Sequence, residues 1–328
     1  MKILGETYNV IDTFDSDMTV PDCLVATKNK LGKGHGESKL YVASKDVMRA
    51  FYGNEGFVAR CFLLKDDLKQ YMNAIKPEYL RPTYDYRGKD KMSKLWEDRM
   101  KDIELLDDII YFNVSDQAQI AGPRGYVNSD DEGYQLIREI SLPLVSYISV
   151  MKVTPNGKDI YYYWKLFVDY DMINADEALV FNYGKQREDD IIPQQHTQEK
   201  KRVELGRARL GQGKYRDALL EECIFCPITM INDERLLIAS HIKPWAVSTD
   251  KEKVDPKNGF ILSPLYDKLF DKGLISFTDD KHLIVSNWIS PSNIKRMELE
   301  NNKYYPKLPI DEQRIAYLNY HRAYVFKG

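Results

Sequence analysis

The chain has 328 residues, 43% of them hydrophobic and 30% charged, with a formal net charge of −3. This length and composition favour two domains with sizeable cores over one large domain. No apolar run is long enough to span a bilayer, the N-terminus turns polar too early for a secretion signal, and four cysteines make no disulfide framework. We therefore expect a cytoplasmic protein without a membrane partner. The acidic total does not exclude DNA binding, which needs only a basic face.

Residues 1 to about 185 have the pattern of a mixed α/β domain. Lys165 is the only charge in the aromatic run 160–168, which predicts a largely buried strand. The clearest helix is 91–106, where Trp96, Met100 and Ile103 follow a helical period. Further strands are predicted at 40–43, 56–64 and 144–150. The glycine-rich stretch 32–39 does not have the spacing of a Walker motif, which favours a basic loop.

The segment 186–202 is charged and glutamine-rich, and it has no apolar period. It predicts a linker or the start of a solvated helix, with a domain boundary near residue 195 that divides the chain into 1–195 and 196–328. A basic cluster follows it, and this cluster is either a phosphate-binding surface or an ordinary solvated helix start. The residues that could contact DNA are Arg207, Arg209, Gln212, Lys214, Arg216 and Lys243.

Two short strands and a helix are predicted between residues 236 and 273. The strands are 236–242, which ends before Pro244, and 258–262. Ser263 and Pro264 have the residue types of an N-cap and a first helical position, and Gly273 is a suitable stop. The three elements would bring one histidine, one asparagine and one carboxylate into a compact unit.

His241, Asn258 and Asp267 are the residue types that phosphodiester hydrolysis requires. A histidine can deprotonate water, and a carboxylate can hold one hard divalent cation such as Mg²⁺. Each residue also has a purely structural interpretation. A lone strand histidine is often structural, Asn258-Gly259 could be a turn, and Asp267 could compensate the helix dipole.

Several motifs of this region resemble the HNH nuclease family, which has the ββα-metal fold. The similarity is greatest to the branch found in bacterial restriction-type endonucleases and covers about the last 130 residues. The matching stretches are Gly211-Gln212 with Tyr215-Arg216, Ser240–Trp245, Asn258-Gly259, Leu269–Phe277, Tyr317–Arg322 and Val325-Phe326.

The resemblance implies a role for each of three residues. His241 would be the general base, Asn258 the orienting residue, and Asp267 would take the place of the family's last metal-binding histidine or asparagine. Asn258 and Asp271 are further candidate metal ligands, with Asp255 in reserve. Many members carry a ligand just before the base, where this chain has Ser240.

Cys223 and Cys226 form a pair of the kind that some family members use for structural zinc. Such a site needs four ligands, and no second pair exists in the sequence. Buried thiols are therefore favoured over zinc.

These observations predict an α+β protein with a C-terminal ββα-metal nuclease domain and a mixed α/β N-terminal domain that recognises DNA. The expected activity is metal-dependent endonuclease cleavage of double-stranded DNA, of restriction type. Two alternatives remain open: an enzyme that requires methylated or hydroxymethylated bases, and an inert DNA-binding protein. A palindromic target would favour a homodimer.

Overall fold

A computed structural model describes residues 1–14, 18–22, 24, 38–170, 173 and 213–328. The described residues form two compact units, Met1–Asp169 with Asn287–Lys295, and Tyr170–Ser286 with Arg296–Gly328. The predicted boundary near residue 195 lies outside the described residues. No helix in these ranges is both long enough and apolar enough to cross a bilayer.

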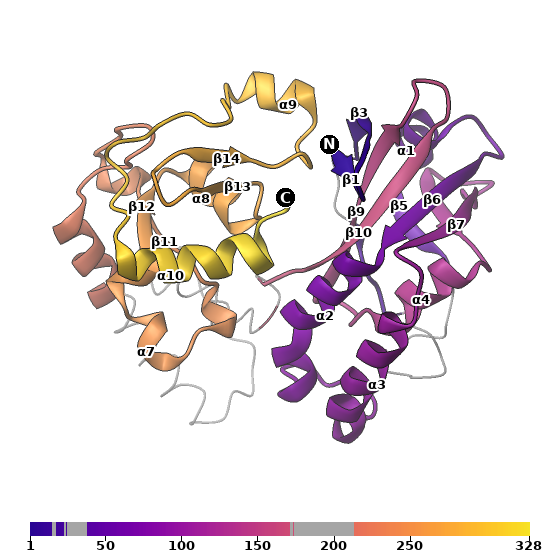
Figure 1. Ribbon diagram of the computed structural model, residues 1–328, viewed down its shortest axis with the longest axis horizontal. Coiled ribbons are helices and arrows are strands. Elements are labelled where there is room, and N and C mark those ends of the chain that lie inside the picture. The colour runs from indigo at the N-terminus through magenta and orange to yellow at the C-terminus, as the bar shows by residue number, and fades with distance from the viewer. Residues whose placement is uncertain (15–17, 23, 25–37, 171–172, 174–212) are drawn as a thin grey trace. The chain divides into compact units, whose positions relative to one another are not determined.

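The N-terminal unit is built on a mixed eight-stranded sheet with helices (Figure 1). Its strands run in the order β3-β9-β10-β6-β7-β8-β5, and β4 also pairs with β9. Among the described strands, β6 and β10 pair in parallel and the other pairs are antiparallel. The sheet strands are β3 (Asn9–Thr13), β4 (Met18–Thr19), β5 (Leu40–Ser44), β6 (Val58–Leu64), β7 (Ile109–Asp116), β8 (Arg124–Asn128), β9 (Ser146–Thr154) and β10 (Tyr161–Val168). A separate hairpin joins β1 (Lys2–Ile3) and β2 (Glu6–Thr7).

The helices of this unit pack on the sheet and on one another, with α2 against β10, β6 and α3, α1 against β8 and β5, and α4 against β7. Their bounds are α1 (Lys45–Tyr52), α2 (Lys65–Leu80), η1 (Lys89–Lys91), α3 (Met92–Glu104) and α4 (Glu132–Ile140). Helix α9 (Pro291–Arg296) also belongs to this unit up to Lys295. The predicted helix 91–106 is therefore confirmed as α3, and the predicted strand 160–168 as β10. Lys165 is buried and pairs with Asp67 at 2.9 Å, which satisfies its charge inside the unit.

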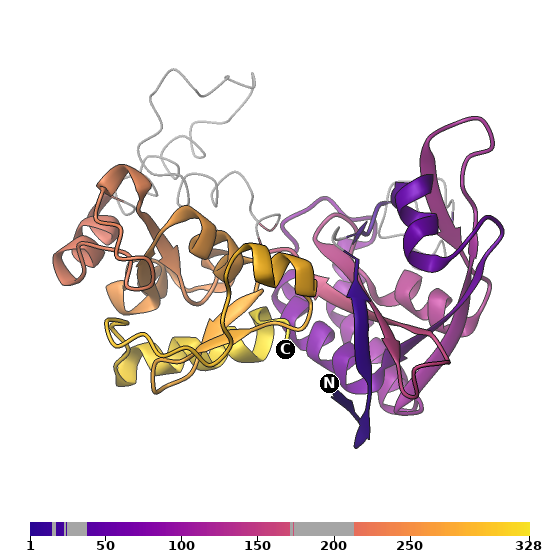
Figure 2. The ribbon, with the colours of Figure 1, turned by 90° about the horizontal axis from the view of Figure 1, so that it is seen from above.

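The C-terminal unit contains two small antiparallel sheets, β11–β12 and β13–β14. Residues 213–222 are helical. The other elements are η3 (Glu234–Leu236), β11 (Ile238–His241), η4 (Trp245–Val247), α7 (Asp250–Lys253), η5 (Pro256–Asn258), β12 (Gly259–Leu262), α8 (Pro264–Asp271), β13 (Ile275–Phe277), β14 (Leu283–Val285), α10 (Glu312–Tyr320) and the π-helical η6 (His321–Val325). In Figure 2, which shows the ribbon from above, this unit is the orange to yellow part except for residues 287–295. The α+β class predicted from the sequence is confirmed.

Helix α8 begins and ends where the sequence predicts. Ser263 is its N-cap and Pro264 its first residue, although the Ser263 hydroxyl makes no capping hydrogen bond and accepts instead from the Cys226 thiol at 3.8 Å. Gly273 follows the helix with a φ of +65°, and a Cβ there would lie 1.9 Å from the Val325 carbonyl oxygen. Only glycine can make this turn without strain.

Candidate functional site

The site is built on a strand–strand–helix unit made by β11, β12 and α8. The two strands are antiparallel, and His241 at the end of β11 pairs with Gly259 at the start of β12. Helix α8 follows β12 after one residue and packs against β11. Both strands are almost completely buried; β12 has no polar side chain, whereas β11 ends with the buried polar residues Ser240 and His241. This arrangement holds a histidine, the asparagine before β12 and the carboxylates of α8 in one small fold.

The side chain of His241 is held as a neutral imidazole with a defined proton position. Its Nε2 lies 3.0 Å from the backbone carbonyl oxygen of Lys253. A carbonyl only accepts hydrogen bonds, so Nε2 carries the proton and Nδ1 is the basic nitrogen. The side chain is buried, with 6% exposure, and burial lowers the pKa of His241 to about 4. At neutral pH the imidazole is therefore in the form that can accept a proton.

The carbonyl that orients His241 belongs to the last residue of α7. A helix ends with carbonyl groups that have no partner inside the helix. Two of these groups at the end of α7 are used by the site. Lys253 O accepts from His241, and Glu252 O accepts from the Asn258 side-chain amide at 3.1 Å. A capping box of Thr249 and Glu252 fixes the other end of α7.

Asn258 is fully buried, and its side chain ties together the loop between β11 and β12. Its Oδ1 accepts from the backbone N–H of Lys243 at 2.8 Å. Its Nδ2 donates to the carbonyls of Lys243 at 3.3 Å and Glu252 at 3.1 Å, and to the Ser248 hydroxyl at 3.4 Å. Since the same loop carries the Lys253 carbonyl, these bonds support the orientation of His241.

Tyr215, from the helix at 213–222, covers the face of the His241 ring. The two rings are stacked with centroids 4.3 Å apart and planes 10° from parallel. The Tyr215 hydroxyl donates to the Asn258 carbonyl at 3.0 Å. Burial raises the pKa of Tyr215 well above its usual value, so this donor keeps its proton. The sequence showed Tyr215 only as part of a motif, because no local pattern reveals a stacking partner 26 residues away.

Asp267 and Asp271 lie one helical turn apart on α8. Asp267 is buried in the first turn, with 8% exposure, and Asp271 is half-buried. Within the described ranges, no three His, Cys, Asp or Glu side chains gather closely enough to bind a metal ion together. Mg²⁺ usually keeps several waters and takes one or two carboxylates together with substrate phosphates. Asp267, on the helix that packs against β11, has the residue type that such an ion takes as a ligand.

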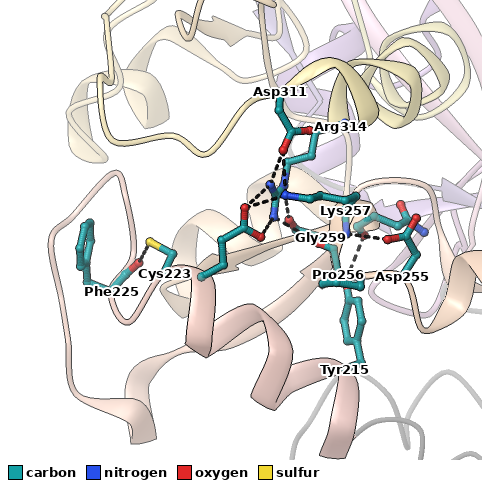
Figure 3. A network of polar contacts seen from close by, with 11 residues as sticks. Tyr215, Cys223, Phe225, Asp255, Pro256, Lys257, Gly259, Asp311 and Arg314 are labelled. Carbon is teal, nitrogen blue, oxygen red and sulfur yellow. Dashed lines mark hydrogen bonds and ion pairs between the residues drawn. The ribbon is translucent and has the colours of Figure 1, made fainter.

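The two cysteines near the site are free thiols. Cys223 Sγ donates to the Phe225 carbonyl at 3.1 Å (Figure 3), and Cys226 lies beside Ser263. Burial raises the pKa of the Cys223 thiol. Both therefore pack as small apolar side chains with weak donors.

The residues predicted to contact DNA have different positions. Arg207, Arg209 and Gln212 lie outside the described residues, and Lys214 is exposed. Arg216 donates to the carbonyls of Leu237 at 2.7 Å and Glu234 at 2.8 Å, so it anchors the approach to β11. Lys243 pairs with Glu252 at 2.8 Å, and its side chain is 17% exposed. Lys243 is thus in an ion pair, and Arg216 is hydrogen-bonded to main-chain carbonyls within the C-terminal unit.

Gly259 leaves the space that Tyr215 occupies, and we expect Gly259→Ala to destabilise the unit. A Cβ at this position would lie 2.0 Å from the Tyr215 hydroxyl oxygen and 2.9 Å from a Leu219 methyl carbon. Overpacking of this kind costs about 1–3 kcal/mol. Urea unfolding monitored by circular dichroism measures the change. Gly213→Ala is the matched control, because no residue in the described ranges comes within 4 Å of a Cβ placed there. Equal stabilities of the two variants would contradict the packing argument.

Residues 226–278 match the family model described as HNH endonuclease. A search of curated proteins finds no match. The matched segment contains β11, β12, α8 and β13, together with His241, Asn258, Asp267 and Asp271. Such a domain implies a nuclease that hydrolyses phosphodiester bonds in a nucleic-acid substrate, with a divalent metal as cofactor. Residues 226–278 of this chain are an HNH endonuclease domain.

Proposed function

We propose that the protein is a metal-dependent DNA endonuclease of restriction type, with His241 as its general base. The observation that carries the proposal is the hydrogen bond from His241 Nε2 to the Lys253 carbonyl, which makes Nδ1 the proton-accepting nitrogen. The low pKa of the buried ring keeps this nitrogen unprotonated at neutral pH. The matched domain supplies the reaction class.

The proposed reaction is an in-line attack of water on the phosphorus of double-stranded DNA. His241 Nδ1 accepts a proton from the attacking water. The Lys253 carbonyl and the Tyr215 ring hold the imidazole in position during this transfer. Asn258 orients the loop through its side-chain amide and is a further candidate ligand. Asp267, with Asp271 as a second candidate, would hold a Mg²⁺-like cation, which stabilises charge on the phosphate and the departing 3′ oxygen.

The N-terminal unit is proposed to select the DNA. This role follows from the division into two compact units, only one of which contains the HNH segment. Selection could use a base sequence or a modified base, and a palindromic site would favour a homodimer.

A cleavage assay tests the function directly. Purified protein is incubated with plasmid DNA, methylated and unmethylated, with Mg²⁺, Mn²⁺, Co²⁺ or Ni²⁺ and with EDTA. We expect metal-dependent linear products that EDTA abolishes, and end mapping then gives the cleavage pattern. Cutting of the modified plasmid alone would favour the modification-dependent enzyme. Binding without cutting under every metal would contradict nuclease activity and leave an inert DNA-binding protein.

The rate should also show an unusual pH dependence. A base acts only when it is unprotonated, so activity is retained above its pKa and is lost below it. Since the pKa of His241 lies at about 4 rather than 6.5, we expect no titration step between pH 6 and 7.5 in kcat/KM. Cleavage rates measured across this range at saturating metal provide the check. A tenfold loss per pH unit below pH 7 would contradict the neutral buried imidazole.

A further inference from the structure

Arg314, on the C-terminal helix α10, lies completely inside the unit that carries the site. Its exposure is 0%, which is unusual for a charged side chain. It lies outside the matched segment 226–278. A buried guanidinium is stable only when its donors are paired, so its partners indicate what it organises.

The partners of Arg314 account for every N–H of the guanidinium (Figure 3). Nη1 donates to Glu222 Oε1 at 2.8 Å and Asp311 Oδ2 at 3.2 Å, and Nη2 donates to Glu222 Oε2 at 2.6 Å. The two remaining donors go to main-chain carbonyls. Nη2 reaches Pro256 O at 3.2 Å and Nε reaches Gly259 O at 3.1 Å. Five donors are available on a guanidinium, and all five are used.

The charges around Arg314 balance. Lys257 bonds to Glu222 and to Asp311, each at 2.9 Å, so two cations face two carboxylates. The pKa of Glu222 is lowered to about 2, mainly by the hydrogen bond from Arg314. The cluster therefore stays fully charged at neutral pH and joins the helix at 213–222 to α10 and to η5.

The two carbonyls bound by Arg314 lie on either side of Asn258 in the chain. The carbonyl of Asn258 itself accepts from the Tyr215 hydroxyl at 3.0 Å and from the Ile242 N–H at 3.0 Å. The backbone at 256–259 is thus fixed by one side chain from each of two helices. Gly259 is also the strand partner of His241. A displacement of this backbone would move both the orienting asparagine and the base.

We infer that Arg314 is a positioning residue for the nuclease site: it holds the backbone on both sides of Asn258 and thereby sets the geometry of Asn258 and His241. The expected effect of Arg314 on the cleavage rate rests on the proposed function. Its effect on the position of Asn258 and His241 rests on the contacts alone. A small displacement of catalytic groups can lower a rate by about 100-fold without loss of binding. A residue that served only stability would not have this effect in protein that remains folded.

The test compares Arg314→Lys and Arg314→Met with Arg322→Met. Arg322 is in the same unit, and its guanidinium donates to the Phe277 carbonyl and to Asp279, outside the β11–β12 loop. Far-UV circular dichroism and thermal melting select conditions under which each variant is folded. We expect Arg314→Lys to lower kcat about 10- to 100-fold with little change in KM for DNA, whereas Arg322→Met keeps the wild-type kcat. If Arg314→Met does not fold, Arg314→Lys carries the comparison.

A second measurement does not depend on cleavage. Histidine-selective NMR follows the His241 resonance against pH, with His241→Gln providing the assignment among five histidines. We expect the His241 signal to shift, and its pKa to rise toward 6.5, in Arg314→Lys but not in Arg322→Met. Wild-type kcat together with an unchanged His241 titration in folded Arg314→Lys would overturn the inference. Absence of cleavage in the wild type would instead contradict the proposed function, and the NMR comparison would still test the positioning role.

Discussion

His241→Ala is expected to lower the cleavage rate about 1,000-fold or more while DNA affinity stays within about threefold. General base catalysis contributes roughly 100- to 10,000-fold, and an alanine offers no group to accept the proton. The substitution should leave DNA binding nearly unchanged, because the imidazole is buried and bonds to Lys253 rather than presenting a charge. Single-turnover cleavage at saturating Mg²⁺ and gel-shift titration measure the two quantities.

His282→Ala is the matched control for this experiment. His282 belongs to the same C-terminal unit and is half-buried. Its Nδ1 lies 3.3 Å from Asp280 Oδ2, outside the strand–strand–helix unit. Its loss should leave the rate within about twofold, as for a surface substitution. Full activity in His241→Ala would remove the histidine from the mechanism, whereas equal losses in both variants would indicate a general structural effect.

Asp267→Ala is expected to reduce cleavage at least about 100-fold and to raise the Mg²⁺ concentration needed for half-maximal rate. A bound cation stabilises the transition state by several kcal/mol, and each 1.4 kcal/mol corresponds to a tenfold change in rate. Asp267 is the buried carboxylate of α8, on the helix that packs against the strand of His241. Rates measured over a Mg²⁺ titration separate a weakened cation site from a damaged fold.

Asp271→Asn tests the other carboxylate of the same helix. If Asp267 is the principal ligand, Asp271→Asn should change the half-maximal Mg²⁺ concentration less than Asp267→Ala does. Asp279→Ala serves as the control, because Asp279 pairs with Arg322 and lies outside the strand–strand–helix unit of β11, β12 and α8. An unchanged Mg²⁺ dependence in Asp267→Ala, combined with a strong effect of Asp271→Asn, would assign the ligand role to Asp271.

Several elements could be predicted from the sequence because their causes are local. The apolar and aromatic run at 160–168 forms β10, which begins one residue later, at Tyr161. The Ser-Pro start and the glycine stop define α8, since caps and positive φ angles depend on neighbouring residues. The predicted strand 236–242 is shorter in the structure, because residues Glu234–Leu236 form a 3₁₀ turn and β11 begins at Ile238.

Other features depend on contacts between residues far apart in the chain. Residues 287–295 belong to the N-terminal unit, where Trp288 packs on Tyr163 and Phe167. The amino-acid composition of residues 287–295 does not indicate that they belong to the N-terminal unit. Lys243 stays a predicted DNA contact, and the structure adds an ion pair with Glu252 of α7 that the local sequence does not reveal.

The sequence by itself determined the identity of His241, Asn258 and Asp267 as candidates, and the order of the strands and helix that carry them. Residue type and short-range periodicity are sufficient for that, because both act over a few residues. Only the tertiary structure decided which nitrogen of His241 is basic and which residues hold it. Buried polar groups must find partners wherever the fold supplies them. Arg314 and Glu222, 92 residues apart, are such a pair.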